Sequence, residues 1–291
     1  MKKKIISVIA GVAGLTMAYF LASGISHIIY NHPEESTPAE SETQSTVQGT
    51  EEAKSAMTED EINEMLAGMK TTETAETETA AEEQKEVIPV KFEELQAVNP
   101  DVYAWITVPG TDIDYPILQH ASDNSYYLMH NIDGSYGYPG CIYTENMNSK
   151  DFTDNNTVIY GHNMKNGSMF AQLHKFEDPD FFDANREVLI YLPDEVLHYT
   201  IFAAHIYDDR HLLYSFDFTD PEVYQKYLDS IFSIRDMSAN IDKNITVTTD
   251  DQIITLVTCI GSQPNNRLLV QAVLTDREPG VETARAAATT E

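Results

Sequence analysis

Residues 31–87 set the strongest limit on how this chain of 291 residues can fold. They contain no Phe, Trp or Tyr, and their 16 Asp and Glu residues face only three Lys, a net charge of −13. Such a segment buries too little apolar surface to offset the conformational entropy lost on ordering. We therefore expect a disordered acidic linker over 31–87. Residues 58–69 combine a capping-box pattern with apolar residues at helical spacing, which predicts a transient helix inside the linker.

The next segment, residues 88–278, carries most of the aromatic side chains and is long enough, at about 190 residues, to bury a full core. We expect one folded domain there and a disordered tail over 279–291. Across the whole chain, 18 Lys and Arg against 47 Asp and Glu give a formal net charge of −29. A polyanion of this size repels nucleic acid and anionic lipid headgroups, so neither is an expected partner.

The first 30 residues predict a membrane anchor. A lysine cluster at positions 2–4 precedes residues 5–25, an apolar run long enough to cross a bilayer as a helix of about 20 residues. The alternative is a cleaved signal peptide, but the apolar run exceeds the usual length of about 7–15 residues. We therefore expect residues 1–30 to be a retained signal-anchor, with the protein single-pass in the cell membrane and its folded domain extracytoplasmic.

Short runs rich in β-branched and aromatic residues recur through the folded domain, most of them bounded by Gly, Pro, Asn or Asp. We expect strands over residues 102–108, 140–143, 157–160, 188–192, 197–207, 245–248, 253–259 and 268–274. Helices are expected over 92–98, 168–176 and 220–234, the last beginning at an Asp-Pro-Glu sequence that suits a helix start. Many short strands with few helices predict a mainly β fold, a closed or nearly closed barrel.

Three side chains could together carry nucleophilic chemistry. Cys259 ends the apolar run 252–259, where a sheet would hold its sulfur at the surface, and His162 follows another strand directly after a glycine. Arg267 begins the next strand, and its guanidinium could reach the cysteine and stabilise an oxyanion if residues 260–266 form a loop. Taken singly, each has a plainer interpretation as a core cysteine, a surface histidine or a solvated arginine. The prediction therefore depends on all three being brought together.

The chain has only two cysteines, Cys141 and Cys259, too few for a fold built on disulfides. One bridge between them is possible from the sequence alone, whereas a catalytic thiol requires Cys259 to be free. We interpret Cys141 as a core thiol. The His–Asp pairs at 130–133 and 205–208 lack a recognised metal-ligand spacing, so we expect no metal and no cofactor.

Taken together, these residues resemble the sortase family. Residues 255–259 read Thr-Leu-Val-Thr-Cys and fit the family's Thr-Leu-Xaa-Thr-Cys motif, with Arg267 following at a suitable distance. Further blocks resemble class B sortases, which are cysteine transpeptidases of Gram-positive bacteria. They lie at residues 99–106, 109–116, 124–128 and 160–170. The similarity spans about residues 90–276, nearly all of the expected domain.

This resemblance implies an eight-stranded sortase barrel with N-terminal helices and a helix in the loop before the cysteine strand. It also implies that Cys259 is the nucleophile, His162 the proton-transfer partner and Arg267 the oxyanion stabiliser. The residues implied to line a substrate groove are Asn124, Leu128, Tyr160 and Thr258.

The implied reaction begins with a C-terminal sorting signal on a surface protein. The thiolate attacks the carbonyl after a Thr, and an amine of a peptidoglycan precursor resolves the thioacyl-enzyme. Class B members often have Ser at the position of Val257 and an acidic residue at that of Ile260, so the preferred sorting sequence stays open. So does the choice between cell-wall anchoring and pilus assembly.

Two other functions are compatible with the same residues. A hydrolytic cysteine protease would use the same cysteine and histidine, with water resolving the acyl-enzyme. A non-catalytic barrel could bind cell-wall peptides, although the intact Cys, His and Arg set argues against it.

Overall fold

The structure is a computed structural model that describes residues 59–69 and 86–282. Of these residues, all but 209–211 belong to one compact unit. The predicted boundaries at 30, 87 and 278 stay predictions. Helix α2 (Glu59–Gly68) falls inside the predicted linker, and strand β10 (Gln263–Glu282) continues past residue 278.

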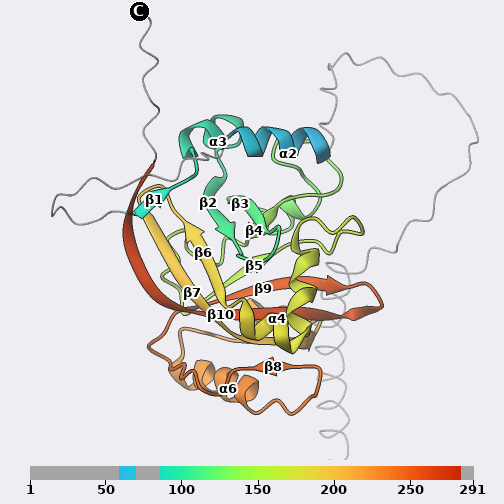
Figure 1. The fold of residues 1–291 in the computed structure, drawn as a ribbon, viewed down its shortest axis with the longest axis vertical. Coiled ribbons are helices and arrows are strands. Elements are labelled where there is room, and N and C mark those ends of the chain that lie inside the picture. The colour runs from blue at the N-terminus through green and yellow to red at the C-terminus, as the bar shows by residue number, and fades with distance from the viewer. Residues whose placement is uncertain (1–58, 70–85, 283–291) are drawn as a thin grey trace, which may run out of the picture. The chain divides into compact units, whose positions relative to one another are not determined.

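Ten described strands form one hydrogen-bonded sheet, and eight of them close into a barrel (Figure 1). Their order is β1-β10-β9-β5-β4-β3-β2-β6-β7-β8, and an additional antiparallel pairing of β10 with β7 closes the ring. Strands β1 and β8 attach outside it. The remaining bounds are β1 Glu86–Ile88, β2 Val102–Thr107, β3 Asp114–Leu118, β4 Ile142–Thr144, β5 Asn156–Tyr160, β6 Glu187–Tyr191, β7 Glu195–Asp208, β8 Asn240–Ile241 and β9 Ile253–Ile260. The predicted eight-stranded barrel is confirmed.

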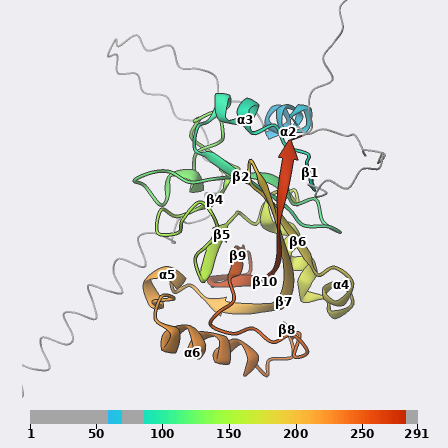
Figure 2. The same cartoon turned by 90° about the vertical axis from the view of Figure 1, so that its left-hand side faces the viewer.

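The helices lie between or before the strands. Their bounds are α3 Phe92–Val98, α4 Pro179–Ala184, α5 Leu212–Ser215 and α6 Pro221–Phe232, with 3-10 helices η1 Tyr126–Leu128 and η2 Phe170–Glu177. Helix α6 begins as the sequence predicts, because the Asp220 side chain accepts hydrogen bonds from the backbone N–H groups of Glu222 and Val223. It precedes the cysteine strand β9 in the chain and lies beside β8 (Figures 1 and 2).

Alternate residues of the barrel strands enter two separate apolar clusters, one for each face of the sheet. In β9, Ile253 and Val257 belong to the first cluster, and Ile254 and Leu256 to the second. The first cluster also contains Ile62 and Leu66 of α2, so this helix packs its apolar face onto the domain. Helix α2 is therefore part of the packed structure, which its acidic surroundings in the sequence did not indicate.

Some predicted elements are wrong. Residues 245–248 form no strand. Their apolar pattern has another cause: Val247 is buried in the first cluster without pairing to a strand. Strand β3 was not predicted because it contains Pro116, which cannot donate a ladder hydrogen bond. Between Ile260 and Arg267, where the sequence analysis allowed for a loop, residues 261–262 form a turn and Gln263 pairs with Ile260. The register then shifts before Arg267, which pairs with Cys259.

The predicted membrane localisation is also corrected. Within residues 59–69 and 86–282, no helix is long and apolar enough to cross a membrane. The helix with the most residues in that part, α6, has 12, against about 20 needed for a span. Residues 5–25, on which the prediction depended, lie outside the described residues.

Candidate active site

Cys259 and Arg267 are brought together by the pairing of β9 with β10. The two strands are antiparallel, and the Cα of Arg267 lies directly opposite that of Cys259. Directly opposed residues of an antiparallel pair project their side chains from the same face of the sheet. The sulfur and the guanidinium therefore start from neighbouring positions on one face.

His162 reaches the same place from β5, which lies parallel to β9 on its other side. The last ladder pair is Tyr160 with Val257. Beyond it the strands stay together, because the Gly161 N–H donates to the Val257 carbonyl at 3.1 Å and the Thr258 hydroxyl donates to the Gly161 carbonyl at 2.9 Å. His162 follows directly, and the side chain of the next residue, Asn163, reaches the Cys259 carbonyl, so His162 lies close to Cys259 in the fold.

The apolar clusters give an independent check on the face of the sheet from which the three candidate side chains project. Tyr160, Val257 and Leu269 all belong to the first cluster, and each lies two residues from one of the three candidates along its own strand. Because side chains on a strand alternate, Cys259 and Arg267 leave the sheet on this common face, and extending the alternation of β5 past its end at Tyr160 places His162 there too. Cys259 is exposed and free, whereas Cys141 is free and buried, so no disulfide joins them.

The imidazole of His162 is held from one side. Its Nε2 donates to the carbonyl of Leu128 at 2.7 Å, and the ring of Tyr138 packs against it with 5.1 Å between ring centroids. In the neutral ring, this bond leaves Nδ1 as the nitrogen that accepts a proton. Burial lowers the pKa of His162 below its usual 6.5, although the bond to Leu128 opposes that effect. This shift favours the neutral ring, which is the form that can accept a proton.

Arg267 is almost fully buried, with 6% of its surface exposed. Its Nη1 donates to the carbonyls of Pro264 and Asn266 at 2.8 and 2.9 Å. These bonds fix the guanidinium at the turn that follows Cys259. A fixed planar cation beside the cysteine can donate hydrogen bonds to an oxyanion without first having to reorganise.

Another histidine, His174, contacts the backbone of Cys259 and was not found from the sequence. His174 places Nε2 3.1 Å from the Cys259 carbonyl oxygen and Nδ1 2.8 Å from a Glu177 carboxylate oxygen. The Asn163 side chain donates to the same Cys259 carbonyl at 3.0 Å. Asn163 was visible in the Tyr-Gly-His-Asn block, but nothing in the sequence distinguished His174 from a surface histidine of η2.

The four predicted groove residues do not share one environment. Leu128 contacts His162 through its carbonyl, and Asn124 accepts a hydrogen bond from the Asn146 N–H at 2.9 Å. Tyr160 and Thr258 are buried at 8% and 2% exposure, so they support the strands beneath the site. Their predicted roles as substrate contacts stay predictions.

The histidines of the two His–Asp pairs, at which no metal was expected, make hydrogen bonds within the fold. His130 donates through Nδ1 to the Tyr126 carbonyl at 2.8 Å, and the buried His205 donates to the Gln271 side chain at 3.1 Å. Within the described part of the chain, the group with ligand-like spacing is Glu86, His198 and Glu278. It shares no residue with the site around Cys259.

A closed barrel that presents a free strand-end cysteine with histidine and arginine on one face has the groups of a cysteine acyl-transfer enzyme. The family model described as "Sortase domain" matches residues 106–275, and the chain therefore belongs to the sortase family.

Similar proteins agree on the class. The chain is 35% identical to sortase B of Listeria monocytogenes over 188 residues, covering 63% of this chain and 74% of that protein. Among solved structures, Clostridium perfringens sortase B is 34% identical with a TM-score of 0.58, covering 64% of this chain and all of that one. A Staphylococcus aureus sortase B–substrate complex is 26% identical with a TM-score of 0.56, covering 64% of this chain and 84% of that one. These similarities imply class B and cysteine transpeptidase activity.

Proposed function

We propose that this transpeptidase cleaves a C-terminal sorting signal after Thr and transfers the resulting protein to an amine of a peptidoglycan precursor. The observation that carries the proposal is the register that sets Cys259, with its exposed thiol, opposite Arg267, while β5 ends two residues before His162 alongside the same strand. The Staphylococcus aureus relative was solved as a complex with its substrate, which supports a substrate site on this fold.

In the first half-reaction, His162 Nδ1 takes the thiol proton and the Cys259 sulfur attacks the carbonyl carbon. Arg267 stabilises the oxyanion that forms. The C–N bond then breaks, and His162 returns the proton to the leaving amine. The product is a thioester between Cys259 and the Thr carbonyl, and no water has been consumed.

The second half-reaction runs the same groups in reverse. An acceptor amine gives a proton to His162 and attacks the thioester carbon. The C–S bond breaks, a new amide forms, and the thiolate recovers its proton. We further propose that Asn124 and Leu128 contact the bound peptide, with Tyr160 and Thr258 supporting the groove from beneath.

The test incubates the full chain with a library of C-terminal pentapeptides and an acceptor peptide that has a free amino terminus. Mass spectrometry then separates the products. A ligated product supports transpeptidation, whereas hydrolysis alone would make the chain a protease. Absence of both products, together with failure of a thiol-reactive probe to label Cys259, would favour a non-catalytic peptide-binding barrel. Repeating the reaction with peptidoglycan-precursor fragments tests the acceptor.

A further inference from the structure

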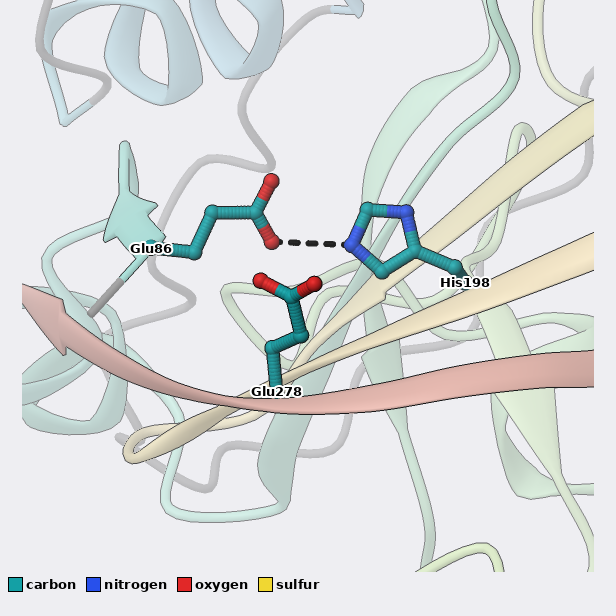
Figure 3. A group of neighbouring side chains, drawn as sticks. All are labelled: Glu86, His198 and Glu278. Atoms are coloured by element: carbon teal, nitrogen blue, oxygen red, sulfur yellow. Dashed lines mark hydrogen bonds and ion pairs between the residues drawn. The ribbon is translucent and has the colours of Figure 1, made fainter. Parts of the chain in front are cut away.

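Three strands bring a histidine and two glutamates together, none of them a residue of the site around Cys259 (Figure 3). Glu86 comes from β1, His198 from β7 and Glu278 from β10, and each is partly buried. His198 Nε2 lies 2.9 Å from a Glu86 carboxylate oxygen. One ligand atom from each residue lies within 4.8 Å of the other two.

Strand register explains why these side chains meet. Glu278 pairs with Val196 on β7, two residues before His198, and Glu86 pairs with Gly280 on β10, two residues after Glu278. An offset of two residues keeps side chains on the same face, and diagonal neighbours are within reach of long side chains. The cluster is thus built into the pairing of β1, β10 and β7.

The Glu278 carboxylate is the least engaged of the three side chains. Among the residues that the structure describes, none makes a hydrogen bond or ion pair with it. The nearby Arg277 pairs with Glu195 at 3.0 Å, and Arg186 pairs with Asp242 at 2.6 Å. Glu86 and Glu278 therefore converge on one imidazole with no Lys or Arg of the described residues paired to either carboxylate, and a bound metal ion would add positive charge among them.

A third carboxylate occupies the position of an outer partner. Glu187 of β6 lies 3.6 Å from His198 Nδ1, on the opposite side of the ring from Glu86. In protein metal sites, a histidine that binds the ion through one nitrogen commonly donates the other N–H to a carboxylate. His198 thus already has the orientation that such a ligand adopts.

We propose that Glu86, His198 and Glu278 bind a divalent transition-metal ion of the zinc class, with Glu187 orienting the imidazole. One imidazole nitrogen and two carboxylate oxygens are donors that zinc accepts, and water can fill the fourth position. Bonds of about 2.0–2.2 Å require the donors to move closer together, which rotation of the partly exposed Glu86 and Glu278 side chains allows. The bound ion joins the three-residue strand β1 to β7 and β10.

The test uses the full chain carrying Cys259→Ala, so that the reactive thiol cannot bind the metal. After treatment with EDTA and dialysis, Zn²⁺ is titrated by calorimetry and Co²⁺ by visible absorption. We expect one equivalent of Zn²⁺ to bind, a tetrahedral Co²⁺ spectrum, and a melting temperature that rises with Zn²⁺ concentration.

Three variants assign the site. Glu278→Gln retains the His198–Glu86 contact and should weaken Zn²⁺ binding by roughly 100-fold, whereas Glu187→Gln should weaken it by about 10-fold. His198→Gln should abolish the Co²⁺ spectrum. His174→Gln is the matched control, because His174 also contacts a glutamate at 2.8 Å but belongs to no such cluster. No saturable binding in the parent protein, or equal affinity in Glu278→Gln and the parent, would overturn the proposal.

Discussion

The two ends of β10 place histidines in opposite electrostatic settings. Near Arg267, His162 is enclosed by η1 and Tyr138, and burial lowers its pKa. Near Glu278, burial also acts to lower the pKa of His198, but the carboxylates of Glu86 and Glu187 outweigh it and the pKa is raised. Both residues are histidines, so the comparison shows that neighbouring charges decide whether the imidazole favours the neutral form or becomes part of a charged cluster.

The largest expected effect is a difference in transpeptidation rate between variants of the two cysteines. Cys259→Ala should reduce transpeptidation by roughly 1,000-fold or more, because no other group supplies the nucleophile. Cys141→Ala should retain turnover and lose only stability, since its thiol is buried and burial raises its pKa. Peptide ligation rates and melting curves of both variants check this. Comparable loss in the two variants would remove Cys259 from its proposed role.

The next effect compares two arginines on β10 directly. Arg267→Lys should lower kcat by about 100-fold, because an ammonium cannot replace a planar guanidinium at an oxyanion. Arg277→Lys, near the other end of the strand, changes a pair with Glu195 and should leave kcat close to that of the parent. Steady-state kinetics measure both. Near-normal turnover of Arg267→Lys would exclude it from the mechanism.

A smaller effect on kcat is expected from the hydrogen bond that holds the backbone carbonyl of Cys259. Asn163→Ala removes the donor to the Cys259 carbonyl, and losing a hydrogen bond of about 1.4 kcal/mol corresponds to a tenfold change. We expect kcat to fall about tenfold with little change in KM, because the lost contact positions the cysteine rather than the peptide. Asn244→Ala, at an exposed turn, is the control. A change confined to KM would contradict this positioning role.

The smallest effect concerns the pH profile. Because the pKa of His162 lies below 6.5, the acid limb of kcat/KM should fall below pH 6.5. Tyr138→Ala exposes the imidazole to water, which should raise that pKa and move the acid limb upward by a few tenths of a pH unit. Tyr136→Ala is the control, since its ring contacts His130 and lies outside the His162 contact. An acid limb that moves downward in Tyr138→Ala would show that burial is not the cause.

Local signals were sufficient to predict several elements. Asp220 and Pro221 fixed the start of α6, and the Thr-Leu-Val-Thr-Cys run placed Cys259 near the end of β9. The parallel pairing of β5 with β9 joins segments 97 residues apart at Gly161 and Thr258, a separation that no local pattern encodes. The resemblance to known sortases, rather than periodicity, therefore brought His162 and Arg267 into the predicted site.

Other features depended on contacts that a single sequence does not reveal. Pro116 concealed β3 because proline argues against a central strand. The Glu86–His198 contact spans 112 residues and arises from the pairing of three strands. His174 reaches the Cys259 carbonyl only because η2 follows β5 and folds back over the strand ends.

The register of β10 has a consequence for insertions and deletions. Adding one residue within a regular part of the strand would turn every later side chain to the opposite face, including Glu278. The pairing with β7 already shifts between Gln271 and Ala272 and between Leu274 and Asp276. At these two irregularities the strand already accommodates a shift in its pairing with β7. Insertions and deletions among related chains should therefore concentrate there, which leaves Arg267 opposite Cys259.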